Sequence, residues 1–244
     1  MALTKVDKSL LETTSGTASA STFLRGDGTW NAPASAGFSD VNATTSTGST
    51  TYTVPTDITK LLVIITGGGG GGGGGVNAVQ GGSGGGSATT VIARVTVVPA
   101  DTITIAVGAA GAGGGTGANG VDGGDSTFTH ATGSGSGSMS TITAPGGRKG
   151  TYMATTMPAV PVAGTVGANN EGISILGGFG GNSGGQASGA PSFWGAGGRG
   201  SQYLMMVATV GTAYGSGGGG AGSQTSYLVG ADGADGVCFI MEYK

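Results

Sequence analysis

The sequence predicts an all-β protein in which a small β-sandwich is combined with packed polyglycine II helices, the left-handed extended helices with three residues per turn. Three observations support this prediction. Apolar and polar residues alternate in several short segments, and no helical period competes with them. Of the 244 residues 58 are glycine, gathered in long tracts between these segments. The chain is 37% hydrophobic and only 9% charged, whereas disordered chains are usually rich in charge.

The strand signals lie between residues 38 and 244. Residues 51–54 alternate, and residues 61–66 form the continuous apolar run of a buried strand. Residues 237–243 predict a C-terminal strand, with one face made of Val237, Phe239, Met241 and Tyr243. Two further strands are predicted by alternation, with faces made of Val91, Ala93, Val95 and Val97 and of Ile103, Ile105 and Val107.

Glycine tracts interrupt these strands at 67–86, 108–124, 177–200 and 215–222. Glycine loses more conformational freedom on folding than any other residue, so an ordered tract needs compensating hydrogen bonds. In polyglycine II the N–H and C=O groups point outward in three directions, and the absence of Cβ lets neighbouring helices bond to one another. A flexible linker is the alternative for any single tract. Several tracts that return to one set of strands favour a packed bundle.

Residues 1–37 differ in composition from residues 38–244, and we expect two domains with this boundary. The first segment contains few glycines and reads STFLRGDGTW at 21–30. This pattern predicts a short strand, a tight turn and a return to Trp30. The Arg-Gly-Asp tripeptide is interpreted as part of that turn. A segment of this size buries little core alone, which suggests partners from other chains.

Charge and cysteine content exclude several classes of protein. A net charge of −3 with nine Lys and Arg residues lacks the basic surface of a nucleic-acid-binding protein. The single cysteine, Cys238, excludes an intrachain disulfide framework and is expected to be a small buried hydrophobe. The N-terminus carries Lys5, Asp7 and Lys8 and does not resemble a secretory signal. No apolar stretch has the length of a membrane span, so we expect a soluble protein made in the cytoplasm.

Catalytic motifs are weak in this sequence. G-x-S-x-G occurs at 81–85 and 181–185, but a chain rich in Gly and Ser contains such matches by chance, and His130 is the single available base. Neither a phosphate-binding G-x-x-x-x-G-K-[ST] loop nor a zinc ligand set is present. Two acidic pairs are interpreted as turn caps in preference to a calcium loop, Asp122 with Asp125 and Asp232 with Asp235. We expect no enzyme activity, no cofactor and no metal.

Several segments resemble bacteriophage tail-fibre proteins. TASASTFLRGDGTW is similar to a short segment that recurs in phage tail fibres. Four more are similar, in order and spacing, to the glycine-rich domain at the tips of phage fibres: YTVPTDITKLLVIITGGGGGGGGG, VTVVPADTITIAVGAAGAGGG, GGDSTF and GADGADGVCFIMEY. The resemblance covers nearly all of residues 20–244 and is weak at 148–176 and 201–214.

The resemblance implies a virion tail-fibre or fibre-tip protein that recognises a receptor on the bacterial host, either a surface glycan or an outer-membrane protein. Residues 1–37 then form a fibre-stalk-like segment that attaches to other phage tail proteins, and such a stalk implies a homotrimer. The tip adhesins of T-even-like phages have a similar glycine architecture but are capped onto the fibre as single chains, so a monomeric tip is the alternative. A structural fibre or adaptor without a receptor is a second class. A tailspike-like glycan hydrolase is a third, but Glu171 lacks the partner carboxylate that such chemistry requires.

The same resemblance implies that loops between polyglycine helices contact the receptor. Aromatic and basic side chains give a large contact area and have few rotatable bonds that lose freedom on binding. The candidate receptor-binding residues are Arg148, Lys149, Tyr152, Phe193, Trp194, Arg199, Tyr203 and Tyr214. Trp194, Tyr152 and Tyr203 are the foremost of these, and a buried anchor between glycine helices is the alternative role for Trp194. The nearby Met153, Met157 and residues 204–206 are expected either in a core or trimer interface or at the surface.

Overall fold

The computed structural model of the protein describes residues 37–76, 80–132, 139–152, 160–182, 187–201, 206–221 and 229–244, with the backbone of residues 23–24 and 30–31. The chain divides into two compact units, Met1–Gly37 and Phe38–Lys244. In the first unit β1 (Phe23–Leu24) pairs antiparallel with β2 (Trp30–Asn31), and Leu24 lies opposite Trp30. This pairing agrees with the expected short hairpin, whose turn and Arg-Gly-Asp tripeptide lie outside the described residues.

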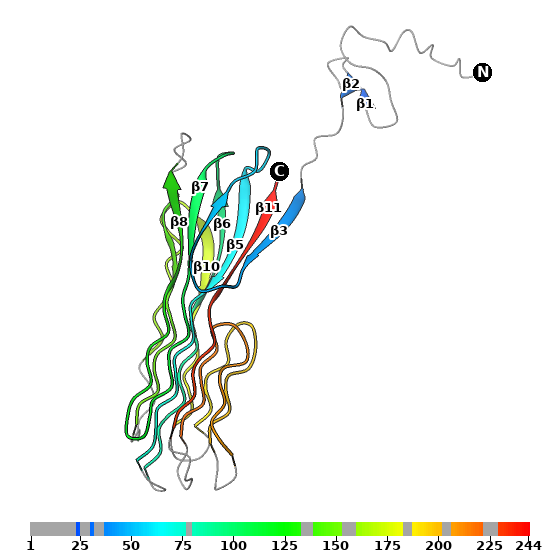
Figure 1. The fold of residues 1–244 in the computed structure, drawn as a ribbon. Helices are drawn as coiled ribbons and strands as arrows, with labels where there is room; N and C mark the ends of the chain where they lie inside the picture. Colours follow the sequence, from blue (N-terminus) through cyan, green and yellow to red (C-terminus); the bar gives the residue numbers. More distant parts are fainter. Residues whose placement is uncertain are drawn as a thin grey trace, which may run out of the picture. The chain divides into compact units, whose positions relative to one another are not determined.

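The second unit is all-β and contains two antiparallel sheets, as the sequence predicts (Figure 1). The five-stranded sheet has the order β10-β6-β5-β11-β3, and the four-stranded sheet has the order β4-β7-β8-β9. The part of the chain that the structure describes contains no helix, and so none that could cross a membrane. The strands are β3 (Phe38–Thr44), β4 (Gly48–Thr53), β5 (Lys60–Thr66), β6 (Thr90–Thr96), β7 (Thr102–Val107), β8 (Ser126–Thr132), β9 (Ile142–Ala144), β10 (Glu171–Ile175) and β11 (Val237–Tyr243).

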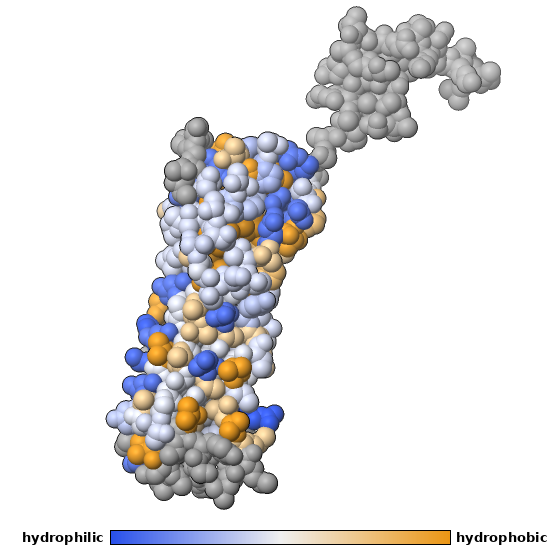
Figure 2. All heavy atoms as spheres, viewed as in Figure 1, coloured by the Kyte–Doolittle hydropathy of each residue, from blue (hydrophilic) through white to orange (hydrophobic). Residues whose placement is uncertain are grey.

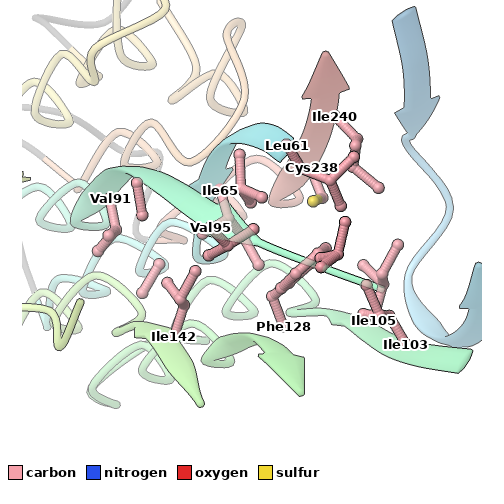
Figure 3. Close-up of a cluster of buried hydrophobic side chains, with 14 of the residues drawn as sticks. Leu61, Ile65, Val91, Val95, Ile103, Ile105, Phe128, Ile142, Cys238 and Ile240 are labelled. Carbon is pink, nitrogen blue, oxygen red and sulfur yellow. The ribbon is translucent and has the colours of Figure 1, made fainter. Parts of the chain in front are cut away.

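The two sheets pack face to face over one hydrophobic core (Figure 3). Alternate residues of β5, β6 and β11 point inward from one sheet, and β7, β8 and β9 supply the facing side chains. The predicted faces in residues 91–97 and 103–107 are confirmed, and both point inward. Full burial of such a side chain contributes about 1.5–3 kcal/mol. The labelled core residues in Figure 3 are Leu61, Ile65, Val91, Val95, Ile103, Ile105, Phe128, Ile142, Cys238 and Ile240.

Apart from Glu242 near its end, strand β11 is apolar on both faces. Cys238 and Ile240 point into the sandwich, whereas Phe239 and Met241 lie half-buried on the outer face of the sheet. The alternation therefore groups the right residues together without telling which group faces the core. Burial raises the pKa of the Cys238 thiol to about 12, so this residue stays protonated and acts as the expected small hydrophobe.

Between strands the chain makes long excursions away from the sandwich (Figure 1). Residues 67–75 leave the end of β5 and residues 80–89 return to β6, while residues 108–125 make the same round trip from β7 to β8. These tracts bond to one another through their backbones, which excludes the flexible-linker interpretation. The other tracts of this glycine bundle are 145–152, 176–182, 187–191, 196–201, 206–212, 215–221 and 229–236.

Residues 67–75 form the central tract of the glycine bundle. Its N–H groups donate to three neighbouring tracts in rotation, and the order repeats every three residues. A three-residue repeat is the period of polyglycine II. The bonds run from Gly68 to Gly124, Gly69 to Ala234, Gly70 to Gly86, Gly71 to Val121, Gly72 to Ala231 and Gly73 to Ser83, with N···O distances of 2.8–3.0 Å.

The carbonyl groups of the central tract accept from three further tracts in the same rotation. Residues 68–73 thus have every backbone donor and acceptor paired, which offsets part of the entropy lost on ordering glycine. Three accepting and three donating neighbours surround the tract. The donors are Gly147 to Gly68, Gly111 to Gly69, Gly218 to Gly70, Gly150 to Gly71, Gly114 to Gly72 and Ala221 to Gly73.

Close backbone approach explains why the central tract is glycine. A Cβ added at Gly70 would lie less than 3.0 Å from the carbonyl oxygen of Arg148, and one added at Gly71 would lie equally close to the carbonyl oxygen of Ala112. A Cβ at Gly115, by contrast, would meet no atom within 4 Å. Glycine in the central tract is therefore a packing requirement.

Peripheral tracts contain fewer glycines than the central tract, so their composition resembles that of loops. The tract 145–152 bonds to the central tract and to residues 80–89. Glycine is needed there only at some positions, as at Gly146, Gly147 and Gly150, where an added Cβ would meet neighbouring backbone. The outer positions accept larger residues, so hydrophobic and hydrophilic side chains are interspersed along the bundle surface (Figure 2).

Candidate functional site

The candidate receptor-binding residues lie on regular tracts and tight turns. The expected placement on loops between tracts holds for the residues on the two turns and is wrong for those on the tracts, because the exposed side of a peripheral tract accepts large side chains. Tyr203 lies outside the described residues, as do Met153, Met157 and Met205. The positions are the tract 145–152 for Arg148, Lys149 and Tyr152, the tract 196–201 for Arg199, the turn 192–195 for Phe193 and Trp194, and the turn 213–215 for Tyr214.

Arg148, Lys149 and Tyr152 lie along one edge of the bundle, where a ladder of Asp and Asn side chains holds their tract. Three ladder residues accept hydrogen bonds through Oδ1 from backbone N–H groups of this tract. The pairs are Asp125 with Gly146, Asp122 with Lys149 and Asn119 with Tyr152, at 2.7–2.9 Å. Arg148 Nη1 lies 3.4 Å from Asp122 Oδ2. These contacts fix the backbone and leave the Lys149 and Tyr152 side chains exposed.

The two turns bring aromatic side chains together at the junction of the sandwich and the glycine bundle. The Trp194 ring centroid lies 5.0 Å from that of Phe193, 5.1 Å from that of Phe239 and 6.4 Å from that of Tyr214. The pairs with Phe193 and Tyr214 are edge-to-face, a preferred arrangement of aromatic rings. The sequence does not identify Phe239 as a candidate receptor-binding residue, because its place in a strand indicates only packing. Through its contact with Trp194, Phe239 joins the turn 192–195 to the outer face of β11.

Trp194 anchors its turn on the five-stranded sheet. Its indole Nε1 donates a hydrogen bond to Oγ1 of Thr66, the last residue of β5, at 2.8 Å. A tryptophan that is partly buried usually pairs its N–H in this way. Trp194 is thus a half-buried anchor between sheet and bundle, and its ring and hydrogen-bond partners are not glycine tracts. Its ring neighbour Tyr214 is 38% exposed.

A groove with a volume of about 990 Å³ opens beside these rings. The tract 229–236 lies at its base, bonded on one side to the tract 206–212 and on the other to residues 108–115. Thr45 and Trp194 line the end next to the sandwich. The other lining residues are Ala110, Val210, Gly211, Thr212, Ala213, Tyr214, Asp232, Gly233, Ala234 and Asp235.

Asp232 and Asp235 line this groove and are exposed. Each uses Oδ1 to accept a backbone N–H bond from residues 108–115: Asp232 from Gly113 at 2.7 Å and Asp235 from Ala110 at 2.8 Å. The turn-cap interpretation of the acidic pairs is therefore wrong, since they cap the N–H groups of a neighbouring tract. Three-residue spacing is the sequence signal that identifies them. Among the described residues no group of three or more His, Cys, Asp or Glu side chains is arranged to hold a metal ion.

The residues of the weak catalytic motifs have structural partners. Ser83, from the match at 81–85, is fully buried, and its Oγ accepts a hydrogen bond from the Thr151 N–H at 2.9 Å. The serine of the match at 181–185 lies outside the described residues. Glu171 forms an ion pair with Arg94 across β10 and β6. Ser83 therefore serves the packing of the tracts.

Two packed sheets that continue into a hydrogen-bonded bundle of polyglycine tracts define a glycine-rich class of all-β protein. A family model described as a glycine-rich domain matches residues 44–243. The chain belongs to this family, and the match includes both the sandwich and the bundle. No curated protein matches the chain.

Proposed function

We propose that this protein is a bacteriophage tail-fibre or fibre-tip protein that attaches the virion to a receptor on the bacterial surface, without enzymatic activity. The observation that carries the proposal is the display of aromatic and basic side chains on a scaffold held by its own backbone. The receptor is a surface glycan or an outer-membrane protein. The segments that resemble phage fibres and fibre tips support the same class of protein.

The scaffold suits attachment because its packing does not depend on the side chains of Lys149 and Tyr152. The tract 145–152 is bonded to the central tract through backbone atoms alone. Lys149 and Tyr152 on its outer side are exposed and take no part in the hydrophobic core. Surface aromatic and basic residues on rigid supports are typical of recognition sites. The exposed residues can therefore change with the receptor while the fold is kept.

The proposal includes a homotrimer assembled through the outer face of the five-stranded sheet. A row of apolar residues crosses all five strands on this face: Ala43, Phe239, Ile64, Ile92 and Ile173. Trp194 packs on Phe239 within this row, whereas Ile173 on the edge strand is 59% exposed. Exposed apolar faces of this kind mark protein interfaces. Arg94 on the same face is paired with Glu171, so its charge does not oppose contact between identical copies.

The mass of the full chain in solution tests the trimer. Light scattering at micromolar concentration is expected to give three times the chain mass of 22.9 kDa. Ile173→Lys places a charge in the apolar row and is expected to give monomers, whereas Val121→Lys, at an exposed position of the bundle, keeps the trimer. A monomer mass for the parent protein contradicts the trimer and favours the single-chain tip.

Cell attachment tests the function itself. Labelled protein is expected to bind susceptible bacteria and to leave their polysaccharide intact. Tyr152→Ala is expected to weaken binding with an unchanged melting temperature, because the ring is exposed. Binding accompanied by depolymerisation would identify a hydrolase instead. Absence of binding would identify a structural fibre component.

Residues 1–37 are proposed to attach the protein to other tail proteins. Phage particles assembled with a chain that lacks these residues are expected to lack the protein, as measured by immunoblot of purified virions. Incorporation of the shortened chain at the parent level would remove this role from the segment.

A further inference from the structure

We propose that the groove beside the aromatic cluster binds a linear, neutral saccharide of the bacterial surface. This inference rests on the proposed attachment function and names the class of ligand and its site. Three features of the groove support it: its shape, its aromatic wall and its two carboxylates, which lie three residues apart.

The shape of the groove follows from the tracts that form it. Its volume of about 990 Å³ is at the upper end of the range for small-molecule sites. Its lining includes residues of the extended tracts 206–212 and 229–236, whose backbones repeat every three residues, or about 9 Å. An open groove of this volume fits several units of a linear polymer.

The aromatic wall supplies apolar contact to sugar rings. Trp194 and Tyr214 both line the groove. Sugar rings present C–H groups on one face, which pack against the electron-rich faces of aromatic rings. Trp194 is held by its bond to Thr66 and by ring contacts with Phe193 and Phe239. Binding therefore costs little rotamer entropy at this residue.

Asp232 and Asp235 supply acceptors for sugar hydroxyl groups. Each carboxylate has one oxygen bonded to a backbone N–H of residues 108–115, which fixes the side chain. Because the two residues lie three apart on an extended tract, their carboxylates repeat about 9 Å apart along the groove. Hydrogen bonds from hydroxyl groups to carboxylates are stronger than those between neutral groups.

The charge of the groove disfavours acidic ligands. Among the described residues its lining contains two carboxylates and no Lys or Arg, so acidic polysaccharides and phosphorylated ligands are repelled.

Tryptophan fluorescence reports directly on this groove. The chain has two tryptophans, and Trp30→Phe leaves Trp194 as the single emitter. The full-length Trp30→Phe protein is titrated with neutral O-polysaccharide released from the lipopolysaccharide of a susceptible strain, and separately with hyaluronan as an acidic polymer. We expect a saturable change in emission with the neutral polysaccharide and none with hyaluronan.

Matched substitutions in the same background locate the binding site. Asp232→Asn and Asp235→Asn keep an Oδ1 acceptor for the backbone and remove the charge, and we expect about tenfold weaker binding for each. Asp125→Asn is the control, because Asp125 makes the same kind of backbone bond to Gly146 outside the groove. Tyr214→Ala is expected to abolish the response. Its control is Phe179→Ala, an exposed aromatic residue on the tract 176–182.

The outcomes distinguish a failure of the saccharide site from a failure of the proposed attachment function. A saturable response lost in the groove variants and kept in the controls supports the saccharide site. Cell binding that persists in all groove variants overturns the site and leaves the attachment function standing. A hyaluronan response equal to that of the neutral polymer, or cell binding without any response of Trp194, overturns the ligand class. Failure of the parent protein to bind susceptible cells overturns the function and the inference together.

Discussion

The sandwich and the glycine bundle bury their backbones in different ways within one chain. Strand β5 has two neighbours in its sheet, β6 and β11, and side chains fill the space above it. From residue 67 onward the same peptide has neighbours on all sides, and no side chain lies between them. The comparison teaches that dense packing needs either side chains between layers or backbone bonds in three directions. The stability of the bundle should therefore be sensitive to an added carbon atom, and that of the sandwich core to a removed one.

The largest effect is expected from adding one carbon to the central tract. In Gly70→Ala the new Cβ meets the Arg148 carbonyl oxygen and forces two tracts apart. Lost hydrogen bonds at about 1 kcal/mol each, together with overpacking, lower the free energy of unfolding by about 3–5 kcal/mol. Urea denaturation measures this change.

Gly115→Ala is the control for this substitution, because its Cβ enters open space. It is expected to leave stability unchanged or to raise it by about 0.5 kcal/mol, since alanine restricts the unfolded chain. Equal stability of Gly70→Ala and Gly115→Ala would show that the tract does not pack as described.

A smaller effect is expected where a side chain completes the backbone network of the bundle. Ser83→Ala removes the acceptor of the Thr151 N–H at a fully buried site. An unpaired buried donor lowers the free energy of unfolding by about 1–3 kcal/mol. The exposed Ser49→Ala on β4 is the control and should change stability little. A parent-like urea midpoint for Ser83→Ala would mean that the N–H finds another partner.

Removing one carbon from the sandwich core is expected to have a modest effect. Ile105 is buried on β7, and Ile105→Val lowers the free energy of unfolding by about 0.5–1.5 kcal/mol. Val121→Ala, at an exposed position of the bundle, is expected to lie within about 0.5 kcal/mol of the parent. The distinction between the regions fails if Ile105→Val destabilises the protein more than Gly70→Ala.

The smallest expected effect is a gain in stability at the turn between β6 and β7. Ala100 has a φ of 68°, in the left-handed region where a Cβ is strained. Ala100→Gly removes this strain but frees the unfolded chain, for a net gain of about 0.5 kcal/mol. Thermal unfolding should show a slightly higher midpoint, and a lower midpoint would contradict the strain.

The sequence predicts well those elements whose local pattern has one physical explanation. Alternation in residues 91–97 and 103–107 identifies buried strand faces, because a strand with one core face repeats every two residues. The glycine run from 67 to 75 identifies the centre of a packed bundle, because only a residue without Cβ fits there.

Peripheral tracts are harder to predict because they need glycine at only some of their positions. Residues 145–152 have the composition of a loop, although they bond to the central tract as regularly as its other neighbours. The groove is harder still, since Thr45, Ala110, Trp194 and Asp235 come from distant parts of the chain. Its position depends on which tracts become neighbours, and that information is not local.

The rotation of neighbours around the central tract limits how the bundle can change in length. Three residues inserted in each tract at the same level bring every donor back into phase and extend the bundle by about 9 Å. One or two inserted residues turn all later N–H groups by about 120° or 240°, toward the wrong partners. The reach of the bundle from the sandwich can therefore grow or shrink only in steps of one helical turn.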